Sequence, residues 1–76
     1  MARTVSTSTT HDGIYVTGAE GQIRIDDYAI RAAIHEIAQR NTVTSGSLTL
    51  HVPQDESQEV IRELLYRLDQ SGIENP

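Results

Sequence analysis

The amino-acid sequence predicts a single small domain of the α+β class, with its elements in the order strand, strand, helix, strand, helix. Two observations support this expectation. At 76 residues the chain is long enough for one hydrophobic core and too short for two. Short stretches that alternate apolar and polar residues also stand before and between two longer stretches whose apolar residues recur at helical spacing.

A β-hairpin is predicted near the N-terminus. Residues 14–17 and 22–25 each alternate apolar with less apolar side chains, and Gly18 and Gly21 bound the short connection between them. The preceding residues, 1–12, are rich in Ser and Thr around a lone valine. We expect them to form either a flexible lead or a weak extra N-terminal edge strand. The domain itself is expected over residues 13–73, followed by a tail of residues 74–76.

The first helix is expected to begin after Asp26 or Asp27, either of which can cap its N-terminus, and to run to about Asn41. Its apolar stripe consists of Ile30, Ala33, Ile34, Ile37 and Ala38. The small and β-branched residues that follow, 42–46, are expected to form a loop.

A third strand is predicted over residues 48–52, because Leu48, Leu50 and Val52 alternate with polar residues until Pro53 ends the run. The connection from the second strand through the helix to this strand should be a right-handed crossover between parallel strands. The expected fold is therefore a two-layer sandwich with a three-stranded mixed sheet and both helices on one face.

The second helix is expected to begin at Asp55, with Gln58 completing a capping box, or at Ser57. Gly72 stands where a left-handed residue ends such a helix. Within the helix, Glu63 and Arg67 have the i,i+4 spacing that favours an ion pair. The apolar stripe is made by Val60, Ile61, Leu64, Leu65 and Leu68.

The charge balance excludes several classes of partner. Six arginines, no lysine and eleven acidic residues give a net charge of −5, which repels phosphate backbones and anionic lipid headgroups. Nucleic acid is therefore not expected as a partner. No window approaches the roughly 20 apolar residues of a membrane span, and the start of the chain lacks the apolar stretch of a signal peptide. We expect no membrane insertion by this chain.

Histidines and carboxylates are the only candidates for catalysis or metal binding, since the chain has no cysteine. His11 beside Asp12, His35 on the exposed side of the first helix and His51 on the third strand each stand alone, without the second histidine that a helical zinc site needs. No serine has a histidine at a nucleophile motif spacing, and no glycine pattern marks a phosphate-binding loop. We predict no catalytic residue, no metal and no cofactor, and hence no enzyme.

Two surfaces remain as candidates for binding. The open face of the predicted sheet is flat enough for a protein partner and carries Tyr15, Thr17, Arg24, Thr49 and His51. The alternative is an acidic surface of the second helix, made by Glu56, Glu59, Glu63 and Asp69.

The hairpin with its Gly21 turn, the first helix, the third strand and the final run from Ser57 to Ile73 (SQEVIRELLYRLDQSGI) together resemble the periplasmic domain of the ExbD/TolR family. The likeness covers about residues 12–73, and its motifs are aliphatic residues, glycines and caps of low specificity. The family's membrane-spanning helix and its proton-carrying aspartate have no counterpart among these residues. The acidic residue that often follows the third strand is displaced here by Val52, Pro53 and Gln54.

The resemblance implies a non-catalytic domain that forms a homodimer and couples an energy-transducing inner-membrane complex to an envelope partner, through dimerisation or pairing at a sheet edge. It implies a periplasmic location. The residues alone leave open a second hypothesis, in which the chain is complete, cytoplasmic and a small acidic regulator or inhibitor of the phage or plasmid type. Such a regulator would use the acidic surface of the second helix to bind a basic site on a target protein.

Overall fold

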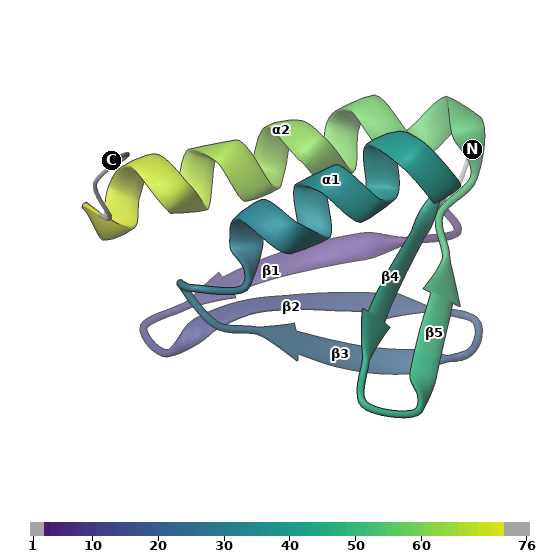
Figure 1. Ribbon diagram of the computed structural model, residues 1–76, viewed down its shortest axis with the longest axis horizontal. Helices are drawn as coiled ribbons and strands as arrows, with labels where there is room; N and C mark the ends of the chain where they lie inside the picture. Colours follow the sequence, from purple (N-terminus) through teal and green to yellow (C-terminus); the bar gives the residue numbers. More distant parts are fainter. Residues whose placement is uncertain (1–2, 73–76) are drawn as a thin grey trace.

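The computed structural model describes residues 3–72, so the predicted tail of residues 74–76 and the last predicted domain residue, 73, lie outside the described part. The elements in chain order are β1 (Ser6–Thr10), β2 (Gly13–Gly18), β3 (Gly21–Ile25), α1 (Ile30–Arg40), β4 (Thr42–Ser45), β5 (Leu48–His51) and α2 (Gln54–Ser71). This arrangement confirms the predicted α+β class. Both helices form one layer on the same side of the β1–β2–β3 sheet (Figure 1).

The first sheet is antiparallel, with β2 in the centre. The predicted hairpin is confirmed as β2 and β3, which pair Ile14 with Ile25 and Val16 with Ile23. All four of these side chains are buried, because alternate residues of each strand face the helices. A two-residue connection, 19–20, joins the strands.

The N-terminal lead forms a strand, so the edge-strand alternative is the one that residues 6–10 adopt. β1 pairs with β2 along its whole length, from Ser6 opposite Thr17 to Thr10 opposite Gly13. Val5, just before the strand, is completely buried in the core. Burial of this one side chain and pairing with β2 order a segment that has almost no hydrophobic pattern of its own.

The predicted parallel pairing of the third strand was wrong. Residues 42–45 form a strand instead of a loop, and β4 pairs with β5 as a separate antiparallel hairpin. Thr42, Val43 and Thr44 are β-branched residues that favour extended backbone, and Gly46 with φ of 61° supports the two-residue turn. Within residues 3–72, β4 and β5 pair only with each other, so the described chain has no crossover between parallel strands of one sheet.

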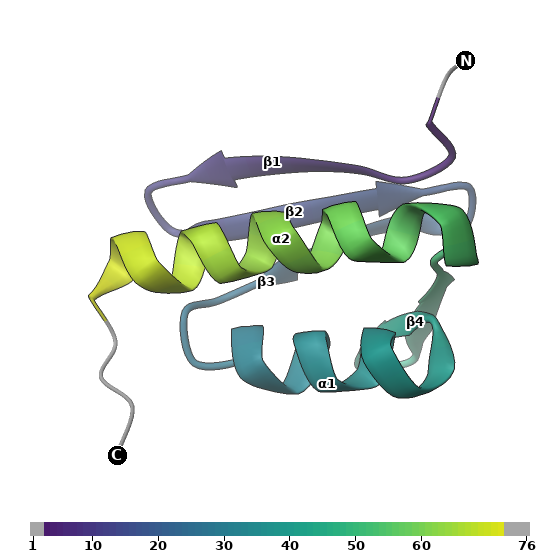
Figure 2. The same cartoon turned by 90° about the horizontal axis from the view of Figure 1, so that it is seen from above.

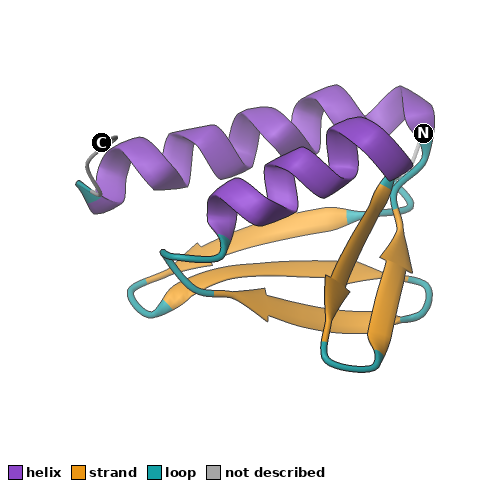
Figure 3. Ribbon diagram, in the orientation of Figure 1, coloured by secondary structure: helices purple, strands orange, loops and turns teal. Residues whose placement is uncertain are grey.

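The order of elements is therefore β-β-β-α-β-β-α, in two sheets. The β4–β5 hairpin crosses the end of the first sheet beside β3, and both hairpin strands contact β3 (Figure 3). A Cβ atom at Gly21 would lie 3.2 Å from Leu48, which shows how closely the hairpin packs on the β2–β3 turn.

The helix ends differ from the predicted caps at two of three positions. Asp26 accepts hydrogen bonds from the N–H groups of Tyr28 and Ala29 and holds the turn before α1, but the N-cap residue is Ala29. For α2 the N-cap is Pro53, and no side chain caps the helix. The C-cap of α2 is Gly72 with φ of 74°, which confirms the predicted left-handed ending.

The core lies between the helices and the two sheets. Its buried hydrophobic residues are Val5, Ile14, Val16, Ile23, Ile25, Ile30, Ala33, Ile37, Val43, Leu50, Val52, Val60 and Leu64. Arg67 is buried beside this core and pairs with Asp27, with 3.1 Å between Nε and Oδ1, and its Nη2 donates to the carbonyl of His11 at 3.3 Å. The expected ion pair of Arg67 with Glu63 was therefore wrong, because the guanidinium points toward the β3–α1 turn.

Candidate interaction surface

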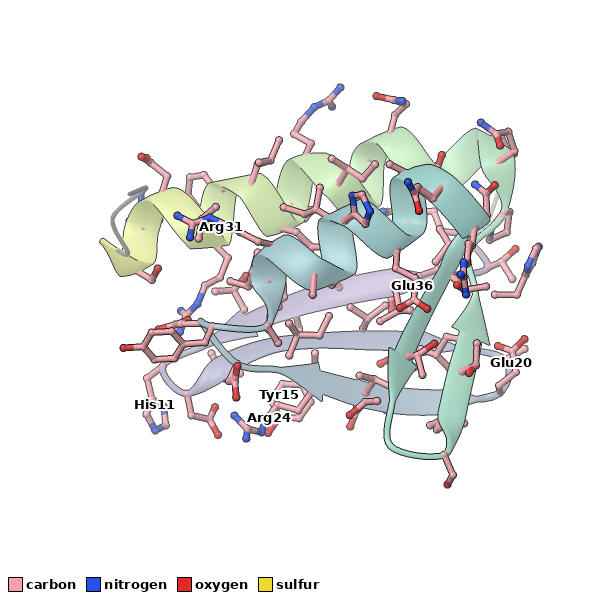
Figure 4. All side chains as sticks on the ribbon, in the orientation of Figure 1. His11, Tyr15, Glu20, Arg24, Arg31 and Glu36 are labelled. Carbon is pink, nitrogen blue, oxygen red and sulfur yellow. The ribbon has the colours of Figure 1, made fainter. Side chains whose placement is uncertain are left out.

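Three of the predicted sheet-face residues lie together on the outer face of the first sheet. Tyr15 pairs across the strands with Arg24, and Thr17 pairs with Gln22, whose amide donates to the Thr17 hydroxyl at 3.0 Å. In Figure 4 the Tyr15 and Arg24 side chains extend from the side of the sheet opposite the helices. Tyr15 is partly buried and the other two are exposed.

Arg24 is committed to the fold. One of its guanidinium nitrogens donates to the backbone carbonyl of Asp12 at 2.8 Å, so the side chain ties β3 to the β1–β2 turn. The Asp12 carboxylate accepts a hydrogen bond from the Thr10 hydroxyl, which lowers the pKa of Asp12, and nearby His11 and Arg24 lower it further. A partner that used Arg24 as a binding residue would have to compete with this contact.

Thr49 and His51 lie on the other sheet. Thr49 is opposite Thr44 in the β4–β5 hairpin, with their hydroxyl oxygens 3.3 Å apart, and exposed His51 is opposite Thr42. The expectation that all five residues share one sheet face was therefore wrong, because the hairpin is hydrogen-bonded separately from β1, β2 and β3.

The predicted acidic surface is divided in the same way. Glu56 accepts hydrogen bonds from the N–H groups of Thr4 and Val5 at 3.1 and 2.8 Å, and these bonds lower the pKa of its carboxyl group. Glu59 forms an ion pair with Arg3 at 3.7 Å. Both acids therefore lie beside the N-terminal end of β1 and hold it against α2.

Glu63 and Asp69 differ in direction. Glu63 is one helical turn beyond Glu59 on the same face of α2. Asp69 is six residues beyond Glu63 and is rotated by roughly 120° from Glu63 about the helix axis. Within residues 3–72 the Glu63 carboxylate has no hydrogen bond or ion pair. Glu56, Glu59 and Glu63 thus form one row along β1, which we call the acidic row, and Asp69 is not part of it.

The sequence left open whether an N-terminal edge strand forms, and the structure shows β1 at an edge of the first sheet. In the described chain β1 has β2 as its neighbour on one side and no strand on the other, and it lies beyond α2, on the side away from α1 (Figure 2). The opposite edge, β3, is crossed by the β4–β5 hairpin. Strand edges are usually protected by lysine, proline or a bulge, and the sequence Ser-Thr-Ser-Thr-Thr of β1 contains no lysine or proline.

The turn between β1 and β2 determines which backbone N–H and C=O groups of β1 point away from β2. The two-residue connection 11–12 makes the flanking pair of Thr10 and Gly13 a hydrogen-bonded pair, and the pattern alternates along the strand. Ser8 and Ser6 therefore bond to β2, and the N–H and C=O groups of Thr7 and Thr9 point outward. These are the groups that a further strand needs.

A small pocket of about 100 Å³ lies between α1, β3 and β4. Its polar side chains include Glu36, whose carboxylate is held by the N–H and hydroxyl groups of Thr44 at 3.1 and 2.9 Å. The Glu36 side chain extends toward β4 in Figure 4. A pocket this small, with its carboxylate already bonded, does not fit a cofactor.

The described residues do not assemble a metal site: no group of three or more His, Asp or Glu side chains comes together within residues 3–72. His11, His35 and His51 are all exposed. Neither described helix is long and apolar enough to cross a membrane.

Comparison of the chain with family models, curated proteins and solved structures found no match.

Proposed function

We propose that this chain is a non-catalytic protein-interaction domain that takes up a further β-strand at the edge of β1, either from another protein or from a second copy. The observation that carries the proposal is an edge of β1 that has no neighbouring strand among residues 3–72, with outward backbone groups at Thr7 and Thr9 and no lysine or proline in the strand to block pairing. Strand addition uses main-chain hydrogen bonds, so it does not require a deep pocket.

The small size of the domain is consistent with this function. A chain of 76 residues has a core that typically supplies only a few kcal/mol of stability. Every strand added to the sheet at β1 would extend the ladder and cover the partly buried Thr7. Binding at this edge therefore also stabilises the domain.

The test is an amide-exchange experiment on the full chain with short extended peptides of alternating Thr and Val. Binding should slow amide hydrogen exchange at Thr7 and Thr9. It should also shift the NMR resonances of β1 more than those of other elements. The variant Thr7→Pro removes one outward N–H and should abolish binding, whereas Thr7→Ala retains the N–H and should bind normally. Peptide-induced changes on a different surface, or equal binding by both variants, would contradict strand addition at β1.

The relation to the ExbD/TolR family remains our proposal for the biological setting, in which the partner would be an envelope protein in the periplasm. It rests on the sequence likeness described above, and the chain adds β1 and β4 to the element order of that likeness. A membrane-spanning segment with a central aspartate encoded directly upstream of this sequence would support it. Deletion of the gene without any defect in envelope transport would count against it.

A further inference from the structure

The occupant of the β1 edge can be specified by charge. We infer, on the basis of the function proposed above, that the partner is an extended segment of another protein with basic side chains at alternate positions, which pair with Glu63 and, in place of Arg3, with Glu59. The row of acids on α2 and the open edge of β1 then form one binding surface.

The position of α2 relative to β1 is set by contacts at both ends. Near the start of α2, Glu56 binds the N–H groups of Thr4 and Val5. Eleven residues later, Arg67 donates to the carbonyl of His11, just beyond the end of β1. The helix and the strand therefore run side by side, as Figure 2 shows. Glu63, between the two contacts, lies beside the middle of β1.

The spacing of the two acids matches that of a strand. Glu59 and Glu63 are four residues apart on a helix, which places them about 6 Å apart along its axis. Alternate residues of a strand point to the same face and are about 6.6 Å apart. A strand added to β1 would therefore present two successive same-face side chains to Glu59 and Glu63.

The row already binds one cation. Arg3, on the line of the chain that leads into β1, forms its ion pair with Glu59 at 3.7 Å. Glu63 is partly buried and has no cationic partner within residues 3–72, because Arg67 is bound to Asp27. The site of Glu63 thus offers a negative charge, beside outward backbone groups, that a basic side chain would neutralise.

A second copy fits this surface poorly. Antiparallel pairing of two β1 strands through Thr7 and Thr9 would place a two-fold axis at Ser8. Because Glu63 lies beside the middle of β1, the two Glu63 carboxylates would approach each other across that axis, and the repulsion of like charges disfavours the pairing. Charge therefore favours a basic segment from a different protein.

The experiment measures binding of the full chain to three fluorescent peptides with one Thr/Val framework and Arg, Gln or Glu at alternate positions. The Arg peptide should bind most tightly and the Glu peptide most weakly, and added salt should weaken the Arg peptide selectively. The single variants Glu59→Gln and Glu63→Gln should each weaken the Arg peptide by about 1.5- to 5-fold and leave the Gln peptide unchanged. The matched control is Asp69→Asn, which removes an acid of the same helix outside the row.

The outcomes separate this inference from the proposed function. Equal binding of all three peptides, abolished by Thr7→Pro, would overturn the basic partner and keep strand addition. Failure of every peptide to bind, with the chain monomeric by light scattering, would overturn both. A dimer seen by light scattering that Thr7→Pro abolishes and that excludes the Arg peptide would replace the basic partner with a second copy.

Discussion

The coupling free energy of the ion pair between Arg67 and Asp27 can be compared with that of Arg67 and Glu63, the pair that the sequence spacing favours. The variants are Asp27→Asn, Glu63→Gln and Arg67→Met, made singly, and the two double variants that combine Arg67→Met with each of the other two. Arg67 is only 9% exposed and donates both to Asp27, at 3.1 Å, and to the carbonyl of His11, at 3.3 Å. Methionine retains most of the packing of the arginine stem and removes the charge.

The expected magnitude follows from this geometry. A buried hydrogen bond to a charged group contributes about 1.5–3 kcal/mol. The Asp27 side chain is 35% exposed, so solvent screens part of the attraction, and we expect a coupling free energy of about 1 kcal/mol between Asp27 and Arg67. The coupling between Glu63 and Arg67 should be close to zero.

Urea unfolding followed by circular dichroism gives the free energy of unfolding of each variant, and each double-mutant cycle then gives one coupling. For a domain of this size, about 1 kcal/mol corresponds to a change in Tm of roughly 4–8 °C. The assignment of Arg67 would be refuted by a coupling to Glu63 that equals or exceeds the coupling to Asp27.

Two further predictions concern the first sheet. The pKa values of Glu56 and Asp12 lie below their ordinary values of 4.5 and 3.8, so both groups stabilise the fold above those values and lose that contribution as the pH falls through the lowered pKa values. Urea titrations between about pH 6 and pH 3 should show this loss, and Glu56→Gln should flatten it; an unchanged pH profile in the variant would remove Glu56 as the cause. In Gly13→Ala the new Cβ would lie 2.6 Å from the carbonyl oxygen of Ile25, at φ of 149°, so thermal unfolding should show a loss of about 1–3 kcal/mol. The control Gly46→Ala, with φ of 61° and open space, should lose less, and the reverse ranking would contradict the steric argument.

The sequence predicted the elements whose hydrophobic pattern is strong. The β2–β3 hairpin, both helices, the strand at Leu48–His51 and the left-handed Gly72 all carry periodic apolar residues or a glycine whose position has a local cause. Local pattern is sufficient there because the side chains that define each element are also those buried in the core.

The elements that sequence reasoning left open or misjudged depend mainly on contacts between distant residues. The ordering of β1 depends on Val5 in the core and on Glu56, more than fifty residues away, and neither contact has a local signature. The strand at residues 42–45 did have a signal, since Val43 stands between two threonines ahead of Gly46, but a short run of this kind is as typical of a loop. The prediction of a parallel crossover was wrong because the handedness rule on which it relied applies to strands of one sheet, and β3 and β5 lie in different sheets.

The candidate site was predicted in its parts and not as a whole. Tyr15, Thr17 and Arg24 do share the outer sheet face, whereas Thr49 and His51 belong to the other sheet. Sheet edges and the acids of α2 were considered as separate surfaces. That Glu59 and Glu63 run beside the β1 edge is visible only once α2 is placed along the strand.

The residues that flank the β4–β5 hairpin are held together, because the N–H of Val52 donates to the carbonyl of Asn41 at 2.7 Å. Its tip is open: apart from Gly46 and its two neighbours in the chain, no atom of the described residues lies within 4 Å of where a Cβ on Gly46 would be. Residues inserted between Gly46 and Ser47 would therefore lengthen the hairpin loop and leave the two ends of the hairpin in contact. This tip, on the β3 side of the molecule, is a suitable attachment point for a fluorescent label or an affinity tag that leaves the β1 edge accessible.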